Sequence, residues 1–199
     1  MDTPVSTVNN IAESVYSIDH ADHIISVDDK WLQFARCNDA QELTREAVHD
    51  KDIWRFISDP DTRVLYRLMF DAVRRRMQPL TVSYRCDSPT KRRFLELTCT
   101  PRPNLVIELH SRLLHEEDRP YASVLDRAQP RTDNFVKICA WCSRCRVDEL
   151  DWREIEDALS ELRVFNCDEP PTVTHGMCPD CHVQKLKEIR QGLHARDAR

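Results

Sequence analysis

The chain has 199 residues, of which 41% are hydrophobic, and its 29 lysines and arginines against 34 aspartates and glutamates give a formal net charge of -5. This is enough for one ordinary domain with its own core and for a smaller unit that needs a further constraint to fold. The acidic balance disfavours a general basic field that would recruit nucleic acid or an anionic membrane. No long apolar segment and no signal-peptide pattern is present, so we expect a cytoplasmic protein with no membrane contact.

The first part of the chain predicts a helix, a strand pair and a further short helix. Apolar residues from Val5 to Val15 recur with the spacing of an amphipathic helix. Two short strands at 16–19 and 24–27 follow, and the polar turn between them predicts a hairpin. A short helix is then expected over 39–48.

The strongest helix signal begins at Asp59. Asp59 is a favourable N-cap, Pro60 suits a first helical turn, and apolar residues share one face until Pro79 ends the pattern. Three strand-like runs come next, at 80–86, 94–100 and 105–109. Alternation of apolar and polar residues in the first two predicts an antiparallel meander. The expected order is therefore a strand pair, short helices, one long helix and three strands.

A charged segment bracketed by prolines separates this sheet from a cysteine-rich tail, and such a segment is typical of a linker. We therefore expect a larger domain at 1–118, a linker at 119–134 and a smaller unit at 135–199. Asp151 and Glu154 form a capping-box pattern that predicts a helix within the smaller unit. A second amphipathic helix is expected over 183–193.

Four cysteines of the tail form two Cys-x-x-Cys pairs, namely Cys139 with Cys142 and Cys178 with Cys181. Each pair can bring two thiolates to one ion from a tight turn, and two pairs supply the four soft ligands that tetrahedral Zn²⁺ prefers. A closed four-thiolate site leaves no open position for water, which favours a structural role. We therefore predict a zinc ion that holds the tail together.

His175 precedes the second pair by three residues and gives the site an alternative ligand. It could replace one cysteine, or it could donate a hydrogen bond to a thiolate, and we favour the second role. The choice between four cysteines and three cysteines with His175 stays open. The next residue, Gly176, is expected to supply a positive φ in the turn beside the sulfurs.

Cys145 extends the first pair to a Cys-x-x-Cys-x-x-Cys run. With Cys167 or Cys178, this run is similar to the ligation of an iron–sulfur cluster in ferredoxins. An iron–sulfur cluster is therefore the alternative cofactor, and it would make the protein a redox or gas sensor. The remaining cysteines, at 37, 86 and 99, are expected to be packing residues of the larger domain.

About 115 N-terminal residues resemble a PAS domain, a sensor fold with a five-stranded antiparallel sheet. The resemblance is carried by 16–19, 24–31, 52–57, Tyr66 with Val73, and 93–97. The tail resembles a small cysteine-rich module that accompanies PAS and other signalling domains in bacterial proteins. That resemblance is carried by Cys139-Ala-Trp-Cys142, Trp152 and His175-Gly-Met-Cys-Pro-Asp-Cys181. The two together imply an α+β fold, a PAS-like sheet with flanking helices followed by a small, zinc-stapled helical module.

The resemblance also implies a function. A cytoplasmic bacterial signalling protein of this kind would receive any signal in the pocket between sheet and helices. Such a pocket can hold haem, flavin or a small metabolite, or it can be empty in a domain that only mediates contacts. A haem there would need a ligand such as His49 or His110, because no histidine lies in the long predicted helix. No kinase, cyclase or helix-turn-helix segment follows the sensor, so we expect output by contact with a signalling partner. Dimerisation through the N-terminal helix is a further expectation from the resemblance.

Other functional classes have less support in the sequence. No catalytic triad order, phosphate loop or paired-carboxylate pattern is present, and two glycines cannot form a glycine-rich phosphate loop, so we expect no enzyme. A DNA-binding transcription regulator would use Lys185, Lys187 and Arg190, although the net charge makes nucleic acid an unexpected partner. A thiol oxidoreductase would use Cys139 and Cys142 and would keep its activity after chelation.

Overall fold

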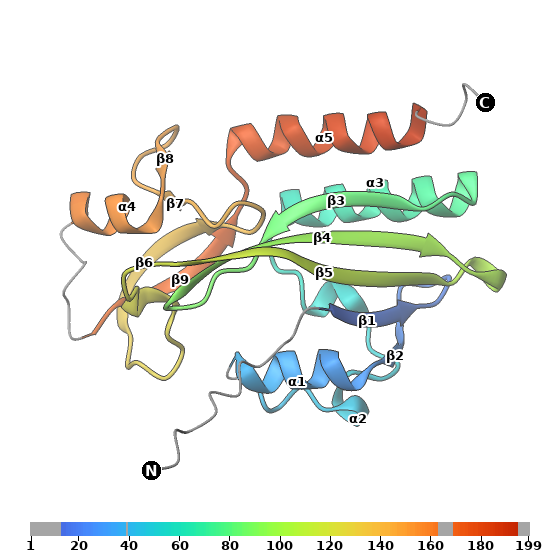
Figure 1. The fold of residues 1–199 in the computed structure, drawn as a ribbon, viewed down its shortest axis with the longest axis horizontal. Helices are drawn as coiled ribbons and strands as arrows, with labels where there is room; N and C mark the ends of the chain where they lie inside the picture. The colour runs from blue at the N-terminus through green and yellow to red at the C-terminus, as the bar shows by residue number, and fades with distance from the viewer. Residues whose placement is uncertain (1–12, 39, 163–168, 195–199) are drawn as a thin grey trace, which may run out of the picture.

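The computed structural model describes residues 13–38, 40–162 and 169–194, and over these ranges the chain forms two β-sheets and five α-helices (Figure 1). The fold is therefore α+β, as the sequence predicts. In chain order the elements are β1 (Glu13–Ile18), β2 (Ile24–Val27), α1 (Asp29–Cys37), α2 (Arg45–Val48), α3 (Pro60–Arg76), β3 (Leu80–Arg85), β4 (Lys91–Pro101), β5 (Ile107–Asp118), β6 (Thr132–Cys139), β7 (Cys145–Arg146), β8 (Trp152–Arg153), α4 (Ile155–Glu161), β9 (Pro171–Gly176) and α5 (Pro179–His194). None of the described helices is both long and apolar enough to cross a membrane.

The larger sheet has five strands in the order β2-β1-β5-β4-β3, and every neighbouring pair is antiparallel. The predicted hairpin is present, with Tyr16 opposite Val27. The predicted meander is present as well, although β4 and β5 are longer than expected and pair from Pro101 opposite Ile107 to Lys91 opposite Asp118. The polar run 110–118 therefore continues a strand. β2 and β3 are the edge strands of this sheet.

The long helix α3 begins and packs as its sequence predicts. Asp59 caps it, since its Oδ2 accepts a hydrogen bond from the Thr62 N–H at 2.7 Å. The helix buries an apolar face against the inner face of the large sheet. The buried residues of this core include Leu65, Met69, Phe70 and Val73 of α3 with Val82, Leu97, Cys99, Ile107 and Leu109 of the strands. Burying each large side chain contributes about 1.5–3 kcal/mol, so this contact holds the sheet and helix together.

The helices between β2 and α3 differ from the prediction. The chain forms α1 at Asp29–Cys37, because the Asp28 Oδ1 accepts from the Trp31 N–H at 2.7 Å and caps the helix. Of the predicted helix 39–48, the structure shows only the short α2. The predicted N-terminal helix lies mostly outside the described residues, and its last residues, from Glu13, belong to β1. The starts of α1 and α2 therefore follow the capping residues Asp28 and Thr44, and not the spacing of apolar residues.

The tail contains a second sheet, whereas its sequence predicts only helices around the cysteines. Its strand order is β8-β7-β6-β9, with β6 and β9 parallel and the other pairs antiparallel. Its core consists of Ala122, Val124, Val136, Ile138, Cys145, Ile155, Ala158 and Leu159. The expected capping box is wrong, because Glu154 itself occupies the cap position of α4 without a side-chain hydrogen bond and the two residues before it form β8.

The last helix, α5, runs alongside α3 and β3 (Figure 1). Its Ile189 is 5% exposed and belongs to the core of the large sheet. The tail also bonds to the outward backbone of the edge strand: the Ser83 N–H donates to Glu188 at 3.2 Å, and the Arg85 N–H donates to the Trp141 carbonyl at 2.8 Å. Unpaired strand edges can pair with other chains, and here the tail covers one of them. The division at 118 and 135 stays a prediction.

Candidate metal centre and the adjoining cavity

The four cysteines of the two pairs meet at one point. The Sγ atoms of Cys139, Cys142, Cys178 and Cys181 all lie within 4.8 Å of one another, and those of Cys142 and Cys178 are 3.7 Å apart. Three of these side chains are buried and Cys142 is half-buried. Four converging thiols of this kind could hold a metal ion.

The first pair lies in a tight turn at the end of β6. The Cys139 N–H donates to the Arg144 carbonyl at 2.8 Å, and the Ser143 N–H donates to the Cys139 carbonyl at 3.0 Å. Ser143 has a φ of 57°, so a serine adopts the left-handed conformation in this turn. The turn reverses the chain so that Cys139 and Cys142 face the same point.

The second pair lies where β9 leads into α5. Cys178 directly precedes the helix and Cys181 lies in its first turn. The Cys178 N–H donates to the Cys139 Sγ, and the Cys181 N–H donates to the Cys178 Sγ, both at 3.4 Å. Backbone N–H groups at a helix start favour negative charge, so this position supports thiolates.

The convergence of the thiols changes their acidity. Hydrogen bonds from Cys139, Cys178 and Cys181 hold the pKa of Cys142 well below that of an ordinary thiol. The pKa of Cys139 falls to about 7, because the raising effect of Cys142 is outweighed by hydrogen bonds with Cys178 and Cys181. Partial burial lowers the pKa of Arg144, but the hydrogen bond and charge of Cys142 raise it overall, together with the charge of Cys178 and a hydrogen bond to Asp180. Hydrogen bonds with Cys139 and Cys142 raise the pKa of Cys178 and Cys181 well above that of an ordinary thiol, so without an ion the negative charge lies on the first pair.

His175 and Gly176 lie beside this cluster in β9. His175 pairs in register with Ile138, and it is not among the side chains that meet within 4.8 Å. It lines a cavity next to the cluster instead. The expected role of Gly176 is wrong, because its φ is not positive. An added Cβ there would lie 2.7 Å from the Lys137 Cδ, so the glycine makes room for a neighbouring side chain.

Cys145 does not join the four cysteines. It lies on β7, fully buried in the core of the small sheet, and burial raises its pKa to about 11. The Cys-x-x-Cys-x-x-Cys run therefore does not converge on one point. Cys167, the other candidate for an iron–sulfur cluster, lies outside the described residues. Cys99 is a core residue of the large sheet, as expected, and burial raises its pKa to about 12.

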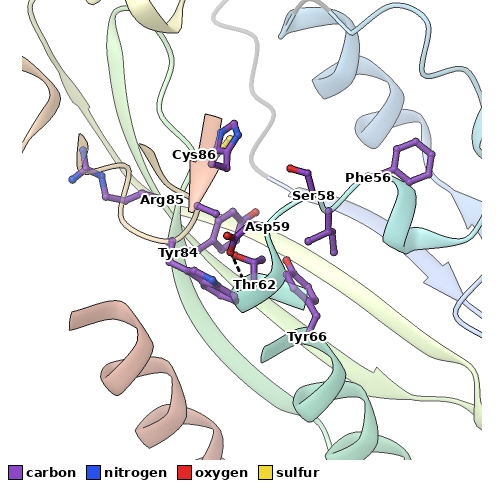
Figure 2. A pocket seen from close by; sticks show the side chains of 12 residues that line it. Phe56, Ser58, Asp59, Thr62, Tyr66, Tyr84, Arg85 and Cys86 are labelled. Carbon is purple, nitrogen blue, oxygen red and sulfur yellow. Dashed lines mark hydrogen bonds between the residues drawn. The ribbon is translucent and has the colours of Figure 1, made fainter. Parts of the chain in front are cut away.

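A cavity of about 280 Å³ adjoins the turn that carries Cys139 and Cys142 (Figure 2). It lies between the start of α3, the end of β3, the turn after β6 and β9. Its walls are formed by Phe56, Ile57, Ser58, Asp59, Thr62, Tyr66, Tyr84, Arg85, Cys86, Ala140, Trp141 and His175. Trp141, between the two cysteines of the first pair, is therefore shared by the cysteine cluster's turn and the cavity.

A second cavity of about 140 Å³ lies between the large sheet and α1. Tyr66 and Tyr84 line both cavities, and burial raises the pKa of both phenols well above the ordinary value. Neither candidate haem ligand lines either cavity. His49 follows α2 and is exposed, and His110 lies 3.9 Å from a Glu13 carboxylate oxygen.

A network of charged side chains joins the tail to the β3–β4 end of the large sheet. Arg119 is fully buried and contacts Asp87 at 2.9 Å and Glu156 at 3.0 Å. Arg85 contacts Asp87 at 2.6 Å and Glu154 at 2.9 Å. No sequence pattern predicts this network, because its members are isolated charges that lie far apart along the chain.

The basic residues expected to contact DNA are not equally accessible. Lys185 is 3% exposed, and its Nζ donates to both oxygens of Glu188 and to the Ser83 Oγ, each at 2.9 Å. Its Nζ also lies 5.7 Å from the centre of the Trp141 ring. A buried, paired lysine does not reach a phosphate. Of the three basic residues expected to contact DNA, only Lys187 and Arg190 are therefore exposed.

Four thiols that could bind a metal ion and a cavity with aromatic walls thus lie side by side where the tail meets the large sheet. A scan against models of known protein families finds no match, and a search of curated proteins finds no similar sequence. The five-stranded antiparallel sheet and the four-cysteine cluster are the features of the structure that agree with the resemblance found in the sequence.

Proposed function

We propose that the chain is a PAS-type signalling protein in which one zinc ion, held by Cys139, Cys142, Cys178 and Cys181, fastens the tail to the edge of the sensor sheet. Its output is contact with another protein and not catalysis. The observation that carries the proposal is the convergence of four sulfurs within 4.8 Å from the β6 turn and the start of α5. A single ion at this point would fix the helix that covers β3.

The sulfur spacing supports a single tetrahedral ion. A Zn–S bond of about 2.3 Å places two ligands of a tetrahedron about 3.8 Å apart. The measured separation between the Cys142 and Cys178 sulfurs is 3.7 Å. Four thiolates complete the coordination of zinc and leave no position for a substrate, which supports a structural ion.

An iron–sulfur cluster is supported less well. Such a cluster places several iron and sulfide atoms between its thiolates and therefore holds them further apart than a single ion does. In addition, Cys145 lies in the separate core of the small sheet. A single iron ion would accept the same spacing as zinc, and it would be distinguished by its colour.

The arrangement of the larger sheet supports a sensor. The order of a strand pair, helices and three strands agrees with the PAS resemblance, and the cavity between the sheet and α1 offers space for a small molecule. The tail touches the sheet through its edge strand, where Ser83 and Arg85 bond to it. A change in the sheet would therefore alter the position of a surface, which is a means of signalling through contact.

Metal analysis and a visible absorption spectrum test the ion, on protein purified without oxygen. We expect one zinc per chain and no visible absorption. Iron with visible absorption would replace this proposal with a redox or gas sensor.

Crosslinking in the source cells tests the output. A photoreactive residue placed at Val183, an exposed position of α5, should join one specific partner. The same position in a Cys178→Ala chain should lose that partner, because α5 is no longer fastened. Absence of a partner with the intact cysteines, or the same partner with both chains, would contradict output through the fastened tail.

A further inference from the structure

The cavity of about 280 Å³ beside the turn that carries Cys139 and Cys142 has the features of a small-molecule site. Its volume lies near the lower end of the roughly 300–1,000 Å³ that ligand pockets span, so an occupant would be small. Four aromatic side chains contribute to its walls, from Phe56, Tyr66, Tyr84 and Trp141. Figure 2 shows Asp59 and Thr62 between the two tyrosines. The cavity is separate from the one between the sheet and α1, although the tyrosines line both.

Buried polar groups with unused hydrogen-bonding capacity line this cavity. Asp59 is 9% exposed, and its Oδ2 accepts from the Thr62 N–H at 2.7 Å. Thr62 and Trp141 are 5% and 4% exposed, and the Thr62 Oγ1 and the Trp141 Nε1 have no hydrogen-bond partner among the described residues. Buried polar atoms are almost always paired in proteins, and the Thr62 hydroxyl could accept a hydrogen bond from a polar occupant. The Trp141 N–H is a donor, so an ammonium group does not pair it and it serves here only as a nearby reporter.

The charge of the cavity wall is negative at Asp59. Across the described ranges, no lysine, arginine or histidine lies within ion-pair distance of Asp59. Arg85 lines the cavity, but its guanidinium is held by Asp87 and Glu154 and points away from Asp59 (Figure 2). The start of α3 offsets part of the Asp59 charge, and this helix end is already capped by Asp59 itself.

The other titratable groups at the cavity do not add a positive charge next to Asp59. Burial lowers the pKa of His175 and the charge of Arg127 lowers it further, and together they outweigh the raising effect of the Asp59 carboxylate, so this ring is neutral at pH 7. Burial raises the pKa of the Cys86 thiol, which is also neutral. Arg127 is exposed and acts on His175 and Cys86, on their side of the cavity. A cation beside Asp59 would therefore have to come from an occupant.

We propose that this cavity binds a small aromatic amine, with its ammonium group against Asp59 and its ring among Tyr66, Tyr84 and Trp141. The ammonium group has three N–H donors, and the Asp59 carboxylate and the Thr62 hydroxyl can accept two of them. Aromatic rings also attract cations, by about 2 kcal/mol or more where water is excluded, so the walls favour the charged end as well as the ring. This inference goes beyond the proposed function, because it requires neither a particular metal nor a protein partner.

A matched series of probes tests the charge of the occupant on the intact protein. The probes are 2-phenylethylamine, 2-phenylethanol and 3-phenylpropionate, which share a ring and differ in charge. The readout is the NMR signal of the Trp141 indole N–H, identified by its loss in Trp141→Phe. We expect a saturable shift with the amine and binding of the alcohol and the acid that is weaker by about tenfold or more. No saturable shift at about 10 mM amine, or equal affinity for the three probes, would overturn the inference.

A pair of variants tests the role of Asp59. Asp59→Asn keeps an oxygen that can accept from the Thr62 N–H and removes the charge, and asparagine caps helices as well as aspartate does. We expect it to weaken amine binding by about tenfold or more and to leave alcohol binding unchanged. Asp61→Asn is the control, because Asp61 is an exposed acid in the same first turn and does not line the cavity. Equal weakening by both variants, or by neither, would contradict the site. If Asp59→Asn does not fold, the probe series alone decides.

Discussion

Each of the two sheets of this chain is stabilised in a different way. The five-stranded sheet buries a continuous apolar core against α3, in which Leu65, Phe70, Ile107 and Leu109 are at most 1% exposed. The four-stranded sheet has a smaller core, and two of its strands, β7 and β8, contain two residues each. The cysteine cluster joins the end of β6 to the start of α5, and the Arg119 ion network reaches α4 through Glu156.

The difference shows how a small unit can be added to a stable sheet. Apolar burial grows with size, so a large core is stable by itself and a small one needs a metal, ion pairs or a neighbouring surface. Here the cysteines, Trp141 and Ile189 join the core of the large sheet. The tail therefore shares the stability of the larger unit through its contacts with β3 and α3.

The largest expected effect is the loss of the metal. Cys178→Ala should release the ion and unfold the small sheet and α5, while the core around Phe70 stays folded. Structural zinc contributes about 10–16 kcal/mol in zinc-finger peptides, which exceeds what the small core can replace. NMR spectra should lose the dispersed signals of the tail alone. Cys145→Ala is the control: it should cost about 1 kcal/mol and leave the metal content unchanged. Equal metal loss in both would contradict the four-cysteine site.

The next effect concerns the larger core. Phe70 is 1% exposed, and Phe70→Ala should destabilise the large sheet by about 3–5 kcal/mol, because it removes buried contacts and leaves a cavity. Urea unfolding followed by circular dichroism measures this change. Residues of the tail belong to the same core, so the NMR signals of the tail should be lost at the same urea concentration as those of the large sheet. A tail that stays folded after the large sheet has unfolded would show that the two units are independent.

The ion network should contribute less than either core. Arg119→Met removes a fully buried guanidinium, but Asp87 keeps Arg85 and Glu156 keeps Arg92 as partners. We therefore expect a cost of about 2–3 kcal/mol, below the 3–5 kcal/mol of a fully broken buried pair. Arg112→Met is the control, since Arg112 is half exposed and its pair with Glu96 should be worth less than about 1 kcal/mol. If thermal unfolding shows that Arg119→Met and Arg112→Met lose the same stability, the buried network contributes no more than an exposed ion pair.

The smallest effect is a pH dependence at α4. Burial alone would raise the pKa of Glu156, but a backbone hydrogen bond and the charges of Arg119 and Arg92 lower it. A carboxyl group whose pKa is lower in the folded state stabilises the fold above its unfolded pKa, and this stability is lost as the pH falls. The NMR signals of α4 should therefore broaden or shift below about pH 4.5. Glu156→Gln should remove this acid dependence, and an unchanged profile would contradict the assignment.

The sequence was most informative where the signals are local. Asp59 and Pro60 marked the start of α3, alternation marked β3 and β4, and the cysteine spacing marked the four residues that converge. The missed features depend on distant partners. β7 is two residues long and β9 pairs with β6 in parallel across a long insert, so no periodic pattern could identify the second sheet.

The site was also predictable only in part. The cysteines could be named, but the cavity beside them forms from α3, β3 and the β6 turn, which only the fold brings together. Ser143 has the left-handed φ that a glycine was expected to provide. The DNA-binding alternative requires an exposed Lys185, yet this side chain is buried and contacts Glu188, three residues further along α5, and Ser83.

Hydrogen exchange of the intact chain with and without a zinc chelator tests the central claim most directly. The claim is that a bound metal fastens the tail to β3. Chelation should expose the amides of Ser83 and Arg85, which bond to Glu188 and Trp141, together with those of α5. The amides of β1 and β5, in the interior of the sheet, should keep their protection. Unchanged protection at Ser83 and Arg85 after complete metal removal, or equal loss of protection in every strand, would contradict the account.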